Sequence, residues 1–215
     1  MKERNITVTL NKAKEWFNSG NATLKEIALQ AFDKDELTYN FKNITTFKKA
    51  CEALGLNYDD MFYSIKKIAT ISKASAAMFK LNIIRKALNL GQDLHLTKNP
   101  KDSYIYYPYN PFVTKSSTYY KSEINSGKME VIGKIKSEGE EYNVLGGNAS
   151  TGGGAGLGYF RSSDGVGFAS TGIGFLGCAT KEIAEHFGKY FGMLITEAKY
   201  GDMADFEIIE AAHYA

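Results

Sequence analysis

The 215-residue sequence is poor in the residues that bind metals and form disulfides, with two cysteines and three histidines. Cys51 and Cys178 form no CxxC pair, and two thiols do not make a disulfide framework. No two histidines stand at the spacing of metal ligands, and the HExxH, GxSxG and P-loop motifs are absent. We therefore expect no metal, no cofactor and no dedicated set of catalytic residues.

Long apolar runs are also missing. No window reaches the roughly 18 apolar residues of a membrane span, and residues 1–17 contain no apolar core of signal-peptide length. The sequence therefore predicts a protein without a membrane partner, in a reducing, cytoplasmic setting. A protein of a virus particle assembled in such a cytoplasm would have the same sequence features.

The formal net charge is only +2, which gives no global nucleic-acid signature. The charges are unevenly spread, because residues 41–90 hold nine basic and three acidic residues, whereas residues 201–215 hold four acids and no lysine or arginine. The simpler interpretation is a solvated helix face and a solvated tail. The alternative is a nucleic-acid contact surface in the basic segment, with Lys66, Lys67, Lys73 and Lys80 as its candidates.

Apolar residues recur at helical spacing through the first half of the chain. Before them, the alternation of Ile6, Val8 and Leu10 with polar residues predicts a short strand. Cys51 lies on the apolar stripe of an expected helix, so we expect a buried core thiol there. The expected helices span residues 11–20, 23–32, 46–55 and 71–91.

The composition changes near residue 99, where prolines and tyrosines become dense. We place a boundary there, between a mainly helical region 1–98 and a Gly/Tyr-rich region 99–215, although the two could form one continuous domain.

Residues 129–147 predict a β-hairpin, with Val131 and Ile135 as apolar positions on the first strand. A broad apolar stripe after Thr180, a plausible N-cap, predicts a C-terminal helix. The expected fold class is α+β, with a helical N-terminal half and a small antiparallel sheet packed against the C-terminal helix.

Twelve of the 21 glycines lie between residues 146 and 177. Gly172, Gly174 and Gly177 match the spacing of a dinucleotide fingerprint, but the acid at the right distance, Glu197, falls inside the predicted helix, where the motif requires a second strand. We therefore reject a dinucleotide site.

A flexible linker is also a poor explanation for this segment, since apolar residues alternate with small ones at Leu157 and Tyr159 and again at Val166 and Phe168. This pattern predicts short strands with one small-residue face, which a helix of the same chain, another subunit or a ligand could approach closely. Backbone N–H groups of residues 177–180, at the start of the helix, are a further candidate for binding an anion.

Tyrosine supplies half of the chain's 28 aromatic residues, and it offers a large apolar face with a polar tip. A tyrosine-rich sheet without a ligand is the plain interpretation. The functional interpretation is a binding face formed by the tyrosine run and the neighbouring glycines. Its candidate residues are Tyr104, Tyr106, Tyr107, Tyr109, Gly152, Gly154, Gly156 and Gly158.

Three functions follow from these features. The first is a non-enzymatic binding or assembly protein that uses the Tyr/Gly face on a ligand, a partner protein or a second copy of itself. The second is a nucleic-acid binder that uses the basic helices, with tyrosines stacking on unpaired bases. The third is an enzyme with Cys178 as nucleophile, although a small buried thiol explains that residue more simply.

Two stretches carry a family resemblance. Residues 11–32, followed by residues 46–55, resemble the opening of a group of proteins from Bacteroidales gut bacteria and their phages, including crAss-like phages. The tyrosine-proline segment at residues 104–112 and the Gly-rich approach to the last helix are similar to the end of that group. The resemblance implies a phage or mobile-element product in a bacterial cytoplasm or a virion, and it assigns no activity.

Overall fold

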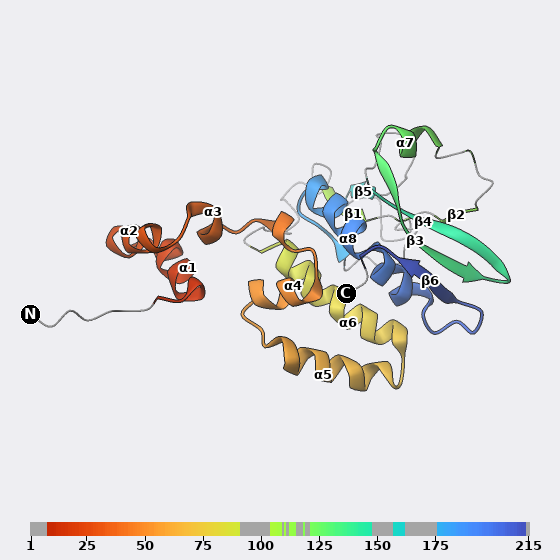
Figure 1. The fold of residues 1–215 in the computed structure, drawn as a ribbon, viewed down its shortest axis with the longest axis horizontal. Helices are drawn as coiled ribbons and strands as arrows, with labels where there is room; N and C mark the ends of the chain where they lie inside the picture. The colour runs from red at the N-terminus through yellow and green to blue at the C-terminus, as the bar shows by residue number, and fades with distance from the viewer. Residues whose placement is uncertain are drawn as a thin grey trace, which may run out of the picture. The chain divides into compact units, whose positions relative to one another are not determined.

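A computed structural model shows two compact units, Met1–Asn40 and Phe41–Ala215 (Figure 1). The predicted boundary near residue 99 lies outside the residues that the structure describes, and it stays a prediction. The described residues are 8–90, 104–108, 110, 112–114, 118, 121–147, 157–161 and 176–213.

The first unit contains three short helices, α1 (Leu10–Asn18), α2 (Ala22–Ala31) and α3 (Lys34–Leu37). The strand predicted from Val8 and Leu10 is wrong, because Leu10 begins α1 and the Thr9 hydroxyl caps this helix by accepting from an N–H of its first turn. Both apolar residues pack on a small core instead. The fully buried members of that core are Ala13, Ala28 and Leu37.

The second unit opens with helices that follow the predicted periodicity. The helix expected at 46–55 is confirmed, with Cys51 fully buried, and the core of the helix expected at 71–91 is confirmed as well. A further amphipathic helix lies between these two. The elements are η1 (Phe41–Asn43), α4 (Phe47–Ala53), α5 (Tyr58–Ala69) and α6 (Lys73–Leu88).

A four-stranded antiparallel sheet follows, in the order β2-β4-β3-β6. The predicted hairpin is confirmed as β3 and β4, which are joined by a turn in which Glu138 and Gly139 both adopt positive φ. The strands are β2 (Phe112–Thr114), β3 (Met129–Ser137), β4 (Glu140–Gly147) and β6 (Glu207–Ala211). The short helix α7 (Lys121–Asn125) lies between β2 and β3 in the sequence.

Two details of the sheet correct the sequence analysis. A register shift between Val131 and Gly133 turns Ile132 into the core, so that Val131 is 41% exposed. The acidic C-terminal segment is not merely a solvated tail, because β6 pairs with β3 through Ile208 and its neighbours. Glu207 and Glu210 of this edge strand remain exposed, and its sequence does not show a regular alternation of apolar and polar residues.

The C-terminal helix α8 (Lys181–Tyr200) holds the unit together. Its predicted N-cap is confirmed, since the Thr180 hydroxyl accepts from the Ile183 N–H at 3.2 Å. Figure 1 shows α8, in blue, between the helices α4 and α6 and the strands β3 and β4, and it contacts both layers. The α+β fold class, with an antiparallel sheet on a C-terminal helix, is therefore confirmed.

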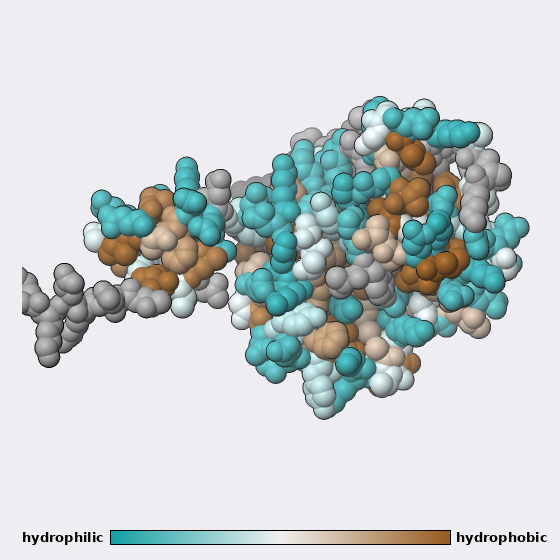
Figure 2. Space-filling view, in the orientation of Figure 1, coloured by the Kyte–Doolittle hydropathy of each residue, from teal (hydrophilic) through white to brown (hydrophobic). Residues whose placement is uncertain are grey.

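The sheet buries apolar side chains on both of its faces. On the α8 side, Ile132, Ile135 and Val144 pack with Met193 of the helix. On the other side, Met129 and Leu145 pack with half-buried neighbours from β2 and α7. Figure 2 shows apolar residues gathered over α7 and these strands on the viewed face. Among the described residues, no helix combines the length and the apolar character that crossing a bilayer requires.

Glycines set the distance between the sheet and α8. A Cβ atom at Gly146 would lie 2.6 Å from the Ile132 Cγ2 atom and 3.1 Å from the Gly188 carbonyl oxygen. A Cβ atom at Gly192 would clash with Asn110 and Ile132. At Gly146, the surface that approaches closely is therefore the chain's own helix. The small-residue face that the alternation at Leu157, Tyr159, Val166 and Phe168 predicts stays a prediction.

Replacing Gly146 by Ala should destabilise the second unit by about 1–3 kcal/mol, because the added methyl group overlaps the Ile132 side chain and also meets the Gly188 carbonyl oxygen, which cannot turn away. Urea unfolding followed by circular dichroism measures this loss. Val131→Ala, on the paired strand, trims an exposed side chain and should cost less. An unchanged unfolding midpoint for Gly146→Ala would contradict the close approach.

Candidate functional site

The tyrosine run and the glycine-rich segment meet in a two-stranded antiparallel ribbon. Strand β1 (Tyr104–Pro108) pairs with β5 (Leu157–Arg161), and the register places Tyr107 opposite Gly158. Both strands contact α8. The sequence predicted only that these two segments, about fifty positions apart, lie near each other. The structure adds which residue of β1 pairs with which residue of β5.

The predicted binding residues fall into two groups. Tyr104, Tyr106 and Tyr107 belong to β1, and Gly158 belongs to β5. The other candidates, Tyr109, Gly152, Gly154 and Gly156, lie outside the described residues.

The second edge of β1 is also occupied. Tyr106 and Cys178 form an antiparallel bridge in which the Tyr106 N–H donates to the Cys178 carbonyl at 3.1 Å. The Cys178 N–H donates in return to the Tyr106 carbonyl at 2.8 Å. The ribbon is therefore anchored to the segment that leads into α8.

The side chain of Asn89, at the C-terminal end of α6, holds the same segment. Its Oδ1 atom accepts from the Ala179 N–H at 2.8 Å, and its Nδ2 atom donates to the Gly177 carbonyl at 3.3 Å. Asn89 is only 7% exposed, so these bonds satisfy polar groups in the interior. They also weaken the predicted anion site, because the N–H groups of Cys178 and Ala179 already have partners in the chain.

The Cys178 thiol is fully buried, and burial raises its pKa to about 12. A hydrogen bond with Asn89 and the charge of Arg85 act in the opposite direction and do not outweigh burial. Sγ donates weakly to the Leu176 carbonyl at 3.5 Å. Since a nucleophilic cysteine must be an accessible thiolate, this environment favours a structural role for Cys178.

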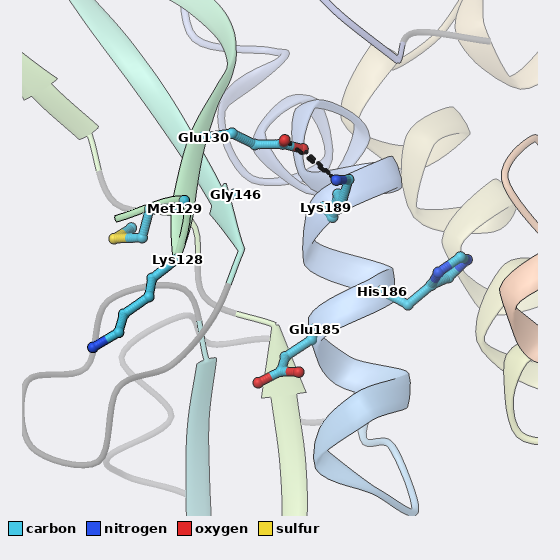
Figure 3. A pocket seen from close by; sticks show the side chains of 8 residues that line it. Lys128, Met129, Glu130, Gly146, Glu185, His186 and Lys189 are labelled. Carbon is cyan, nitrogen blue, oxygen red and sulfur yellow. Dashed lines mark hydrogen bonds and ion pairs between the residues drawn. The ribbon is translucent and has the colours of Figure 1, made fainter. Parts of the chain in front are cut away.

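A cleft of about 200 Å³ lies where β3 and β4 meet α8 (Figure 3). Figure 3 shows Glu130 of β3 and Lys189 of α8 facing each other, and the Lys189 Nζ atom lies 3.1 and 3.2 Å from the two carboxylate oxygens. Glu185 also lines the cleft and forms an ion pair of 3.4 Å with Lys181. Each carboxylate of the cleft therefore has a lysine partner from α8, as expected at a helix–sheet junction.

His186 borders this cleft, but its ring points away from Glu130 and Lys189 (Figure 3). Nε2 lies 2.7 Å from the Ile44 carbonyl oxygen, which can only accept, so Nε2 carries the proton. Burial lowers the pKa of His186, and the neighbouring charges of Lys189 and Lys42 lower it further. The ring is therefore a neutral structural group that joins α8 to the start of the helical layer.

The four candidate lysines lie on two helices. Lys66 and Lys67 are exposed in the last turn of α5, Lys73 is the exposed first residue of α6, and Lys80 is half-buried in α6. The aromatic rings beside Lys66 and Lys67 were not predicted, although Phe62 and Tyr63 stand four residues before these lysines in the sequence. The Glu130–Lys189 pair was not predicted either, because its residues are 59 positions apart and no sequence pattern links them.

Within the described parts of the chain, no group of three or more His, Cys, Asp or Glu residues could hold a metal ion. No model of a known protein family matches the sequence, and neither the curated proteins nor the solved structures contain a match. The resemblance to Bacteroidales and phage proteins therefore stays a prediction. The function has to be inferred from the chain's own residues.

Replacing Asn89 by Ala should destabilise the fold by about 1–3 kcal/mol, since the Gly177 carbonyl and the Ala179 N–H lose their partner in the interior. Asn82→Ala is the matched control, because the Asn82 side chain donates only to the Met78 carbonyl within its own helix. Urea unfolding compares the two. Equal losses in both variants would contradict a special role for Asn89.

Acidification should weaken the fold through His186. Its folded pKa is below the ordinary 6.5, so the unfolded chain takes up this proton first as the pH falls. The contribution is fully present above pH 6.5 and declines as the pH falls towards the folded pKa. His186→Gln keeps an N–H for the Ile44 carbonyl but does not titrate.

The measurement is the free energy of unfolding at about pH 7.5 and about pH 5.5. We expect a smaller decline in His186→Gln than in the natural chain. An identical decline in the natural chain and in His186→Gln would exclude His186 as its source.

Proposed function

We propose that the chain is a non-enzymatic binding or assembly protein whose working face is the β1–β5 ribbon. The observation that carries this proposal is the pairing of the tyrosine run with the glycine-rich segment, Tyr107 opposite Gly158. Tyrosine provides contact area at a low cost in conformational entropy. A glycine opposite it leaves room for a flat ligand or a partner backbone to approach.

The two faces of strand β1 carry different residues. Successive positions of a strand alternate between faces, so position 107 falls on the face opposite to positions 106 and 108. Tyr106 is half-buried and Pro108 is buried. The proposal therefore assigns packing to the face of Tyr106 and binding to the face of Tyr107.

Anchoring supports a binding role for this ribbon. A two-stranded ribbon alone is at best marginally stable in water, but β1 is bridged to Cys178 and both strands contact α8. A surface that is held in place loses less conformational entropy when it binds. The remaining candidates, Tyr109, Gly152, Gly154 and Gly156, lie near the two strands in sequence and stay candidates for the same binding role.

The setting proposed for this activity is a phage or mobile element, in the cytoplasm of a bacterial host or in the virion. It follows from the family resemblance of the sequence. The partner would be a small ligand, a phage protein or a second copy of the chain. The burial of Cys178 and its pKa of about 12 support a binding role over Cys-dependent catalysis.

Native mass spectrometry of the nuclease-treated protein tests the proposal. We expect a closed oligomer, a co-purifying partner or a discrete small-molecule adduct. Tyr107→Ala should abolish this association with little loss of fold, whereas Tyr107→Phe should retain most of it because the ring remains. Tyr63→Ala, on α5, is the control for loss of a tyrosine elsewhere.

Two results would contradict the proposal. One is a bare monomer without any adduct in the natural chain. The other is an association that Tyr107→Ala leaves unchanged while circular dichroism shows an intact fold. Nuclease treatment before the measurement keeps both results independent of nucleic-acid binding by the helices.

A second candidate function, nucleic-acid binding, is favoured by a separate observation on α5. Lys66 and Lys67 of that helix lie beside exposed aromatic rings. This arrangement does not involve the ribbon.

A further inference from the structure

Helix α5 has one face on the core and one face in solvent. Ile65 is buried and Met61 and Ile68 are half-buried, at the helical spacing that packs α5 on α6. Tyr63 lies on the other side and is 61% exposed, whereas Phe62 lies at the border of the packed face and is 37% exposed. Packing accounts for part of Phe62, because Tyr58 links its ring to the buried Phe47, but it does not explain the exposed ring of Tyr63.

Each of these rings has a lysine four residues later in the sequence. The Lys66 Nζ atom lies 4.9 Å from the centre of the Phe62 ring, and the Lys67 Nζ atom lies 4.4 Å from the centre of the Tyr63 ring. The ring of Tyr58 stacks on that of Phe62, with centres 5.7 Å apart and planes 21° apart. Two rings and two ammonium groups thus lie side by side on one helix, with a third ring continuing the aromatic row.

We propose that Phe62, Tyr63, Lys66 and Lys67, the aromatic–lysine face, bind single-stranded nucleic acid. Unpaired bases stack on aromatic rings whatever their sequence, and the adjacent phosphates pair with cations. Both chemistries are present here within two helical turns. A duplex hides the faces of its bases, so it would use the lysines alone.

The surrounding charge favours a polyanion. Residues 41–90 hold nine basic and three acidic residues. Two of these acids, Asp59 and Asp60, are in the first turn of α5, where they complement the helix dipole. The strand would therefore cross the C-terminal half of the helix, at Lys66 and Lys67, away from these carboxylates.

An acidic peptide would satisfy the lysines but not the rings. A carboxylate side chain has no extended planar surface to stack on Phe62 or Tyr63, whereas each nucleotide brings one base and one phosphate. The pairing of a ring with a lysine, repeated at two adjacent positions, matches this composition. Lys73 and Lys80, on α6, are not required by the proposal.

The test is fluorescence anisotropy of a labelled oligothymidylate of about 20 nucleotides, titrated with nuclease-free full-length protein across about 50 to 200 mM salt. Lys66→Gln combined with Lys67→Gln should weaken binding and reduce the slope of log affinity against log salt by about 1.4, since each phosphate contact contributes about 0.7. Lys121→Gln combined with Lys136→Gln removes the same charge from exposed positions elsewhere in this unit and should leave the slope almost unchanged.

Tyr63→Ala should weaken binding about 5-fold or more through lost base stacking, with no change in the salt slope. Tyr63→Phe keeps the ring and should bind like the natural chain. This pair of variants separates stacking from charge, and circular dichroism checks that both remain folded.

Four results would overturn the proposal. They are no measurable binding at low salt, an equal loss in the lysine control, an affinity for duplex DNA equal to that for the single strand, and equal competition by poly-glutamate. The last result would point to an acidic protein partner. Because this site does not include the ribbon, its failure would leave the proposed function of the ribbon untouched.

Discussion

The burial of α8 between two layers is the constraint on which the rest of the second unit depends. Its apolar residues face the helices on one side and the sheet on the other, so Phe187, Phe191 and Met193 are all nearly inaccessible. A helix buried on most of its circumference can approach a sheet closely only where side chains are small. The glycine contacts at Gly146 and Gly192 meet this requirement, and an added methyl group at either position would clash with Ile132.

The same helix connects the core to the ribbon. The segment that leads into α8 is held by Asn89 from α6 and by the backbone of Tyr106 from β1, and Thr180 then caps the helix. The position of β1 therefore depends on the contact between α6 and α8 as well as on its pairing with β5. This dependence explains why Cys178 is buried, because it lies at the point where three parts of the chain converge.

The spacing of apolar residues in the sequence predicted the elements that local interactions determine. The helices α4, α6 and α8 and the β3–β4 hairpin follow from apolar spacing, caps and turn residues in the sequence. The bulge that places Ile132 instead of Val131 in the core could not be predicted, and neither could the pairing of β6 with β3. Both depend on which strand pairs with β3. The same holds for contacts such as Asn89 to Ala179, which join positions about ninety residues apart.

The two proposed binding faces also differ in whether they depend on local or on long-range contacts. The aromatic–lysine face uses residues four positions apart on one helix, so it needs only that α5 forms and packs its apolar side on α6. The ribbon face needs two distant segments in register, and both of them also contact α8. A change that loosens the core should therefore disturb the ribbon before it disturbs the helix face. Nucleic-acid binding that survives mild destabilisation, while association through the ribbon is lost, would be the physical consequence of this difference in contact range.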